Sequence, residues 1–184
     1  MMRFFLSLAA LAAGALSQPA IAQEIHPDPP AEAAVEQLRQ AIGLWDVTTE
    51  FIRENGSVAG AAEGQYRFGW IVPDRVVQGM STIPEWNQAS GILFYVRPST
   101  DEIEMVSVGA DGRLWTMTGP ETGEMRTTPN VTMADGTTLM LRFSRFDVQP
   151  GSFRSRMEMS NDGGQTWRLG NRQHFRRASG DGES

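Results

Sequence analysis

The chain has 184 residues, a formal net charge of −6 at pH 7 and no cysteine. The acidic balance disfavours nucleic acid and anionic membranes as partners, and the lack of cysteine excludes a disulfide framework. All 16 basic side chains are arginine, so Schiff-base chemistry, which requires a lysine amine, is excluded as well.

The first 22 residues are predicted to be a secretory signal peptide. A charge at Arg3 precedes an apolar run over 4–16, and Ala20-Ile21-Ala22 has the small-residue pattern of a cleavage site. The apolar run is too short to cross a membrane as a stable helix. We therefore expect cleavage after Ala22, a periplasmic or secreted mature protein without a membrane span, and an extended linker over 23–30.

A short helix is predicted to follow the linker. Asp28 is placed to cap the helix, and Pro29 is placed at its first position. The helix is expected over 30–42 and ends at Gly43. The apolar residues that recur at helical spacing are Ala31, Val35, Leu38 and Ile42.

The rest of the chain has the alternation of β-strands. Apolar and polar residues alternate over 45–51 and 65–70, which predicts strands with one buried face. Turn signals such as Asn55-Gly56 and Asp135-Gly136 separate the segments. This spacing predicts an all-β fold, an antiparallel up-and-down barrel of about 8–10 strands, in one domain over 31–177 with a disordered polar tail over 178–184. Further strands are expected over 75–82, 90–97, 102–109, 112–118, 123–133, 137–148, 153–159 and 167–177.

The most distinctive segment is the turn of the last hairpin, from Ser160 to Trp167, with the sequence Ser-Asn-Asp-Gly-Gly-Gln-Thr-Trp. Asp162 is placed to accept backbone N–H bonds, and Gly163 and Gly164 are placed to adopt positive φ. Trp167 is expected to cover the loop. These residues serve the turn itself and do not by themselves indicate a glycan site.

The two strands of this hairpin predict a register and a charged face. We expect Met159 to pair with Trp167, which places Glu158 opposite Arg168. Half of the arginines fall after residue 140, and they predict a basic outer face on the hairpin.

Two resemblances follow from these motifs. The turn resembles the Asp-box hairpin of sialidases and many other β proteins. Gly43-x-Trp45 at the start of the first strand resembles the calycin-type barrels, lipocalins among them. This resemblance implies that Trp45 packs against an arginine of the last strand, for which Arg177 has the matching parity and Arg176 is the second candidate. The run over 159–177 is similar to the DUF1579 family of uncharacterised bacterial proteins. Because that family has no known activity, this resemblance implies nothing about the activity of the chain. The residues with implied structural roles are Gly43, Trp45, Asp162, Gly164, Trp167 and Arg177.

Haem, metal and catalytic sites are disfavoured. Nitrobindin-like barrels bind haem through a histidine near the chain end, but alternation places His174 on the outer face beside Arg172 and Arg176. Met157 and Met159 have a spacing found in soft copper sites, yet they lie on an apolar strand face that is expected to pack in the core. No serine lies in a nucleophile-elbow motif and no phosphate loop is present. We therefore expect no cofactor, no metal and no enzymatic activity.

The barrel interior is the candidate site. A barrel of this size is either filled by side chains or holds one small ligand. Binding of a small apolar or amphipathic ligand is favoured, and a filled barrel acting as a structural or protein-interaction module, with an unknown partner, is the alternative. Asn171 and Gln173 are the most telling candidates, because a buried amide needs hydrogen-bond partners from a ligand, water or neighbouring backbone. Trp86 is expected in a loop at a barrel mouth, as a lid or part of a docking patch. The predicted lining residues are Trp45, Phe51, Tyr66, Phe68, Trp70, Trp115, Met140, Met157, Met159, Asn171 and Gln173.

Overall fold

The computed structural model describes residues 30–97, 100 and 102–179. The expectations for the signal peptide, the capping residue Asp28, nearly all of the linker and most of the tail over 178–184 lie outside these residues. In chain order the described elements are α1 (Glu32–Ala41), β1 (Gly43–Ile52), β2 (Val58–Val72), β3 (Val76–Ile83), the 3-10 helix η1 (Pro84–Trp86), β4 (Gln88–Arg97), β5 (Glu102–Gly109), β6 (Leu114–Pro120), β7 (Met125–Thr127), β8 (Val131–Thr132), β9 (Thr138–Gln149), β10 (Ser152–Ser160) and β11 (Arg168–Arg177).

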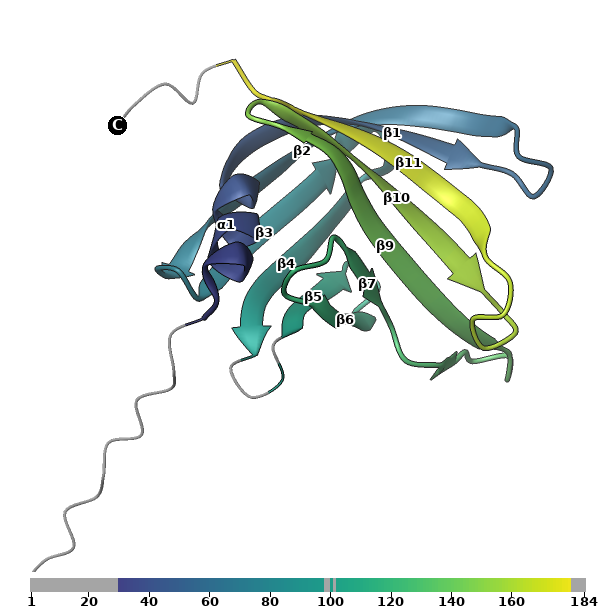
Figure 1. The fold of residues 1–184 in the computed structure, drawn as a ribbon. Coiled ribbons are helices and arrows are strands. Elements are labelled where there is room, and N and C mark those ends of the chain that lie inside the picture. Colours follow the sequence, from purple (N-terminus) through teal and green to yellow (C-terminus); the bar gives the residue numbers. More distant parts are fainter. Residues whose placement is uncertain (1–29, 98–99, 101, 180–184) are drawn as a thin grey trace, which may run out of the picture.

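Ten strands close into an antiparallel barrel, and the predicted fold class is thereby confirmed (Figure 1). Strands β1 to β7 pair in sequence order, and β7 pairs with β9. The pairings β9–β10, β10–β11 and β11–β1 complete the ring. The short strand β8 pairs with β9 alone and is not part of the closed ring.

α1 lies at one end of the barrel (Figure 1); we call this the helix end, and the opposite end, where β1 turns into β2, the loop end. The helix begins at Glu32, later than predicted, with Ala31 at the N-cap position and no side-chain cap. Gly43, with φ 119°, turns the chain from the helix into β1 in a conformation that favours glycine.

The strand predicted over 123–133 is instead two short strands, β7 and β8, interrupted at Pro129. Proline has no N–H to donate to a strand ladder. Thr128 keeps β9 hydrogen-bonded at this point: its N–H donates to the Leu141 carbonyl over 2.9 Å, and its Oγ1 accepts from the Leu141 N–H over 2.9 Å. The ladder is therefore interrupted without leaving Leu141 unbonded.

Aromatic rings fill the core near the helix end. Trp45 is 1% exposed and meets Phe153 and Phe175 edge-on, with centroid distances of 5.0 and 6.4 Å. The Arg177 guanidinium carbon lies 4.2 Å from the Trp45 ring centroid, and Arg177 also donates to the Ile42 carbonyl. The predicted contact between Trp45 and Arg177 is thus present. It joins the first and last strands where the barrel closes, since the two residues are also partners in the β1–β11 ladder.

The last hairpin has a different register from the predicted one. Met159 lies opposite Arg168 and not opposite Trp167, because β11 begins at Arg168 and Trp167 belongs to the turn. Beyond Leu169 the ladder skips Gly170, so that Met157 lies opposite Asn171. A Cβ atom on Gly170 would lie 2.7 Å from Cε of Met159, so a larger residue at the bulge would require the Met159 side chain to move. The predicted pairing of Glu158 with Arg168 is therefore wrong, because the turn is one residue longer than predicted, and Glu158 lies opposite Leu169.

The turn after β10 is held by its own side chains. The hydroxyl and backbone N–H of Thr166 donate to the Asp162 carboxylate, and the Ser160 hydroxyl donates to it over 2.7 Å. These bonds hold the pKa of Asp162 well below its ordinary value of 3.8, with the Thr166 hydroxyl as the largest cause. Gly164 has φ 88°, and Trp167 covers the loop by donating from Nε1 to the Gly164 carbonyl over 3.0 Å.

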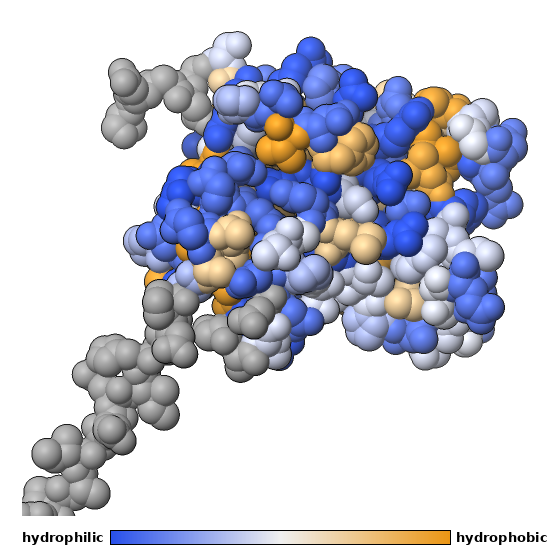
Figure 2. Space-filling model, viewed as in Figure 1, coloured by the Kyte–Doolittle hydropathy of each residue, from blue (hydrophilic) through white to orange (hydrophobic). Residues whose placement is uncertain are grey.

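The outer surface is mostly hydrophilic, with small and separate hydrophobic groups on the face shown in Figure 2. Arginines of the last hairpin lie on this outer surface, and acidic neighbours offset their charge: Arg172 lies 3.0 Å from Glu50, and Arg156 lies 3.4 Å from Glu158. No helix within the described part of the chain has the length and apolar character needed to cross a bilayer.

Candidate ligand-binding site

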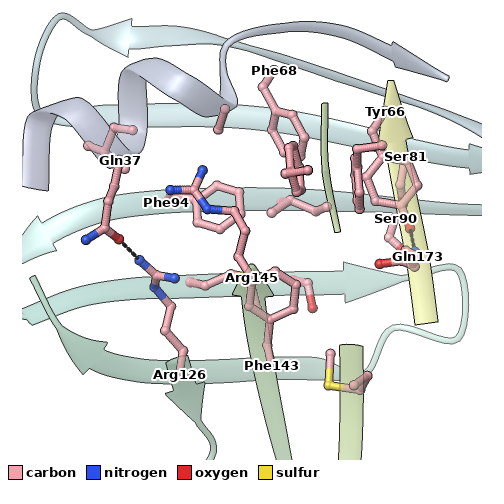
Figure 3. A pocket seen from close by; sticks show the side chains of 18 residues that line it. Gln37, Tyr66, Phe68, Ser81, Ser90, Phe94, Arg126, Phe143, Arg145 and Gln173 are labelled. Carbon is pink, nitrogen blue, oxygen red and sulfur yellow. Dashed lines mark hydrogen bonds between the residues drawn. The ribbon is translucent and has the colours of Figure 1, made fainter. Parts of the chain in front are cut away.

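A cavity of about 200 Å³ lies inside the barrel between α1 and the middle strands (Figure 3). Its polar side chains gather on two sides: Gln37, Arg126 and Arg145 near α1, and Tyr66, Ser81, Ser90 and Gln173 opposite them. Ser107 also lines it. The remaining wall is apolar and consists of Leu38, Ala41, Phe68, Ile92, Phe94, Met105, Phe143, Phe153, Met157 and Phe175.

Four of the predicted lining residues meet in this cavity: Tyr66, Phe68, Met157 and Gln173. They come from β2, β10 and β11, which lie on both sides of β1 in the closed ring. Their common position follows from side-chain alternation, because residues of one strand parity face the interior.

The other predicted residues lie elsewhere. Trp45 belongs to the core at the helix end, and Trp70 packs against that core. The Phe51 ring lies 4.3 Å from the Trp86 ring, a contact that brings η1 over the end of β1. The remaining four do not line the cavity: Trp115 lies under the Arg113 guanidinium at 5.7 Å, Met140 lies beside Gly164, Met159 packs at Gly170, and Asn171 lies opposite Phe51 in the β1–β11 ladder.

Gln173 is held entirely by neighbouring side chains. Its Nε2 donates to Thr49 Oγ1 over 3.1 Å and to Tyr66 Oη over 2.9 Å, and its Oε1 accepts from Ser155 Oγ over 3.0 Å. Burial raises the pKa of the Tyr66 phenol above 10.0, and hydrogen bonds with Gln173 and Ser81 offset part of that shift. The side chains around Gln173 thus supply the partners that its amide needs, and the network fixes one wall of the cavity.

Asn171, two residues earlier on the same strand, is less well satisfied. Its Oδ1 is buried and has no hydrogen-bond donor among the described residues. A buried polar atom without a partner costs about 1–3 kcal/mol. Asn171 lies outside the cavity lining, so this cost is not tied to the cavity itself.

The most unusual members of the cavity wall are two buried arginines near α1. Arg126, on β7, is 4% exposed, and Arg145, on β9, is 8% exposed. The β7–β9 ladder aligns Arg126 with Phe143, so Arg145 is its diagonal neighbour on the same inward face. Both side chains point toward the underside of α1 (Figure 3).

The two arginines differ in their partners. Arg145 forms a two-pronged ion pair with Glu124, from Nε over 2.7 Å and from Nη2 over 2.8 Å, and also donates to Gln40 over 3.2 Å. Arg126 donates from Nη2 to Gln37 over 2.7 Å, and its buried Nε has no acceptor among the described residues. Among the described residues, Glu124 is the one carboxylate that forms a hydrogen bond with either guanidinium.

The environment of Arg126 disfavours its charge. The pKa of Arg126 is lowered from 12.5 to about 10; burial is the largest cause, the positive charge of Arg145 acts in the same direction, and Glu124 opposes both. Arg126 still carries its proton at neutral pH. The group formed by Arg126, Arg145 and Glu124 therefore holds two positive charges and one negative charge, and its two arginines line the cavity.

Sequence reasoning did not identify these two arginines. The alternation of Leu139, Leu141 and Phe143 continues to position 145, so a signal for an inward Arg145 was present, although the arginines after residue 140 were assigned to an outer face. Arg126 had no such signal, because β7 has three residues and shows no period.

His174 lies on the strand parity opposite to that of Gln173 and Phe175, and lines an outer groove with Arg154 and Thr48. The described residues contain no cluster of three or more metal-ligating side chains.

Fold and cavity together define a small antiparallel β-barrel with an internal, partly charged cavity. A scan against protein-family models and a search of curated proteins find no match, so the resemblance to DUF1579 stays a prediction. Among solved structures, the chain is similar to Rv2717c from M. tuberculosis, with a TM-score of 0.55 and 15% identity over 82% of this chain and 99% of that one. The S-type phycobiliprotein lyase CPES from Guillardia theta gives a TM-score of 0.47 and 8% identity, over 78% of this chain and 92% of its own. At 15% identity, the similarity to Rv2717c shows the barrel fold alone. At a TM-score of 0.47, the similarity to the lyase supports no conclusion about this chain.

Proposed function

We propose that this protein binds a small amphipathic ligand inside its barrel. The observation that carries the proposal is the cavity of about 200 Å³, whose walls are mainly aromatic and aliphatic and whose polar groups are confined to two sides. Ligand sites typically combine apolar walls with a few placed polar groups. The volume is below the range of about 300–1,000 Å³ that suits drug-sized molecules, so a smaller ligand is expected.

We also propose a binding role rather than a catalytic one. The charged groups that line the cavity are Arg126 and Arg145, and arginine remains protonated at neutral pH and therefore does not serve as a general base. The raised pKa of Tyr66 favours its protonated form. The predicted signal peptide supports a periplasmic or secreted location, and fractionation of host cells tests it.

The direct test is native mass spectrometry of the protein purified gently from its own host, beside a pair of matched variants. Ile92 lines the cavity, whereas the adjacent Leu93 is exposed on the outer face. Ile92→Phe fills part of the cavity and is expected to abolish retention of a bound small molecule, and Leu93→Phe is expected to retain it.

The proposal is rejected if the wild-type protein shows its bare mass both as purified and after incubation with host metabolite extract. It is also rejected if Ile92→Phe and Leu93→Phe retain a bound molecule equally. A ligand mass that is lost on denaturation and lost in Ile92→Phe supports the proposal and gives the ligand's chemical class.

A further inference from the structure

The cavity wall near α1 has an excess of buried positive charge. Arg145 and Glu124 form a neutral pair with two nitrogen–oxygen distances below 3 Å. Arg126 adds a second guanidinium, 4% exposed, whose bonded partner is the uncharged Gln37 amide. The net charge of the group is therefore +1, and Arg126 carries it on the cavity lining.

Packing does not account for Arg126. Its Nε–H is buried and has no acceptor among the described residues, which is costly for a charged group. A methionine or leucine at a comparable buried position fills space without this cost. Buried titratable groups that a fold tolerates at such a cost are concentrated at functional sites.

We propose that Arg126 and Arg145 bind the carboxylate of an amphipathic monoacid, whose apolar part lies against the phenylalanines of the cavity. The inference rests on the proposed function, because it names the ligand class of the same cavity. A guanidinium presents its N–H donors in a planar fork that matches the two oxygens of a carboxylate. The free Nε–H of Arg126 is one such donor, and a monoanion matches the net charge of +1.

The cavity also sets the size of the apolar part. An apolar cavity of about 150 Å³ is large enough to hold benzene, and this cavity measures about 200 Å³. One aromatic ring with a short acidic chain therefore fits the available volume. Phe143 is the ladder partner of Arg126, and Phe94 lines the same cavity, so both can contact the apolar part of the ligand.

The test compares 3-phenylpropanoate with its uncharged amide by calorimetric titration at neutral pH. The two probes have nearly the same shape and differ in charge. The variants are Arg126→Met, which removes the charge, Arg126→Lys, which keeps the charge without the fork, and Arg172→Met. Arg172 lies on the outer face with its side chain 51% exposed and serves as the matched control.

We expect wild-type protein and Arg172→Met to bind the acid about 10- to 100-fold more tightly than the amide, the range for a hydrogen bond to a charged group. Arg126→Met is expected to lose this preference while its affinity for the amide stays within about twofold. Arg126→Lys is expected to keep part of the preference, because it retains the charge.

Two results overturn the inference and leave the proposed function intact: equal binding of acid and amide by the wild-type protein, or an acid preference that Arg126→Met retains. Failure of the wild-type protein to bind either probe also overturns it. The proposed function is then decided separately by the retained host ligand, since the mass-spectrometric test does not depend on the ligand's charge.

Discussion

Replacing Arg126 by methionine is expected to make the protein more stable. The substitution removes a guanidinium that is 4% exposed and lacks an acceptor for its Nε–H among the described residues. Methionine is long, flexible and apolar, so it can occupy the same volume without a buried charge. Most substitutions at buried positions destabilise a protein, which makes a gain in stability a specific expectation.

The magnitude follows from the pKa of Arg126, which burial and the neighbouring Arg145 together lower from 12.5 to about 10 against the opposing effect of Glu124. A tenfold change in proton affinity corresponds to about 1.4 kcal/mol, so the folded protein disfavours the charged form by about 3 kcal/mol. Loss of the hydrogen bond to Gln37 subtracts about 1.5 kcal/mol. The expected net gain in the free energy of unfolding is therefore about 1.5 kcal/mol, or about 3 to 6 °C in Tm for a domain of this size.

The sign of the pH dependence also follows. Arginine is charged when protonated, and its folded-state pKa is the lower one, so the cost of Arg126 is fully present below about pH 10 and declines as the pH rises through the interval up to 12.5. Between about pH 6 and pH 9 the gain from Arg126→Met is therefore expected to be constant.

Arg145→Met is the matched comparison, because the same chemical change at a neighbouring position is expected to have the opposite effect. It breaks the two-pronged ion pair with Glu124, whose side chain is 36% exposed. Breaking a fully buried pair costs about 3–5 kcal/mol, and the partial exposure of Glu124 reduces the expected loss to about 2 kcal/mol.

Urea unfolding at neutral pH measures both variants against the wild-type protein, with unchanged dependence on urea as the criterion that the compared states are the same. The reasoning predicts a higher midpoint for Arg126→Met and a lower one for Arg145→Met. A lower midpoint for both variants would refute it, because Arg126 would then be stabilising in spite of its unsatisfied Nε–H.

Three further expectations concern β11 and the turn before it. Asn171→Leu removes an unsatisfied buried atom and is expected to leave the free energy of unfolding unchanged or raise it by about 1 kcal/mol. Gln173→Leu leaves three hydrogen-bonded neighbours without their partner and is expected to lower the free energy of unfolding by about 2 kcal/mol. Arg177→Ala is expected to cost about 2 kcal/mol, and exposed Arg176→Ala less than about 0.5 kcal/mol, by thermal unfolding; equal losses would contradict the role of the ring contact. The pKa of Asp162 lies below 3.8, so its stabilising effect is complete above that pH and declines as the pH falls toward the folded-state value. Amide hydrogen exchange of the turn should therefore distinguish Asp162→Ala from wild type at neutral pH and not in strong acid.

The fold could be predicted because its signals are local and periodic. Alternation in long strands such as β1 and β9 fixes which side chains face the interior, and the helix before Gly43 ends where the first strand begins. The errors occurred where one residue interrupts a period. Pro129 splits a predicted strand into two, and Trp167 belongs to the turn of the last hairpin instead of pairing with Met159. Neither changes the hydrophobic pattern enough to be recognised without knowledge of the neighbouring strand.

The candidate site could be predicted only on its uncharged side. Tyr66 and Gln173 follow from alternation, whereas sequence rules place arginine on the surface, because charged residues are seldom fully buried. Arg126 therefore departs from the rule that local pattern and burial agree, and such departures are expected at functional sites. If Arg126→Met is more stable and also loses the preference for an acid, a single residue connects the two findings: the fold tolerates a buried charge at a cost in stability because that charge binds the ligand. A variant that is more stable and still distinguishes acid from amide would break this connection, because the cost of the buried charge would then have no counterpart in binding.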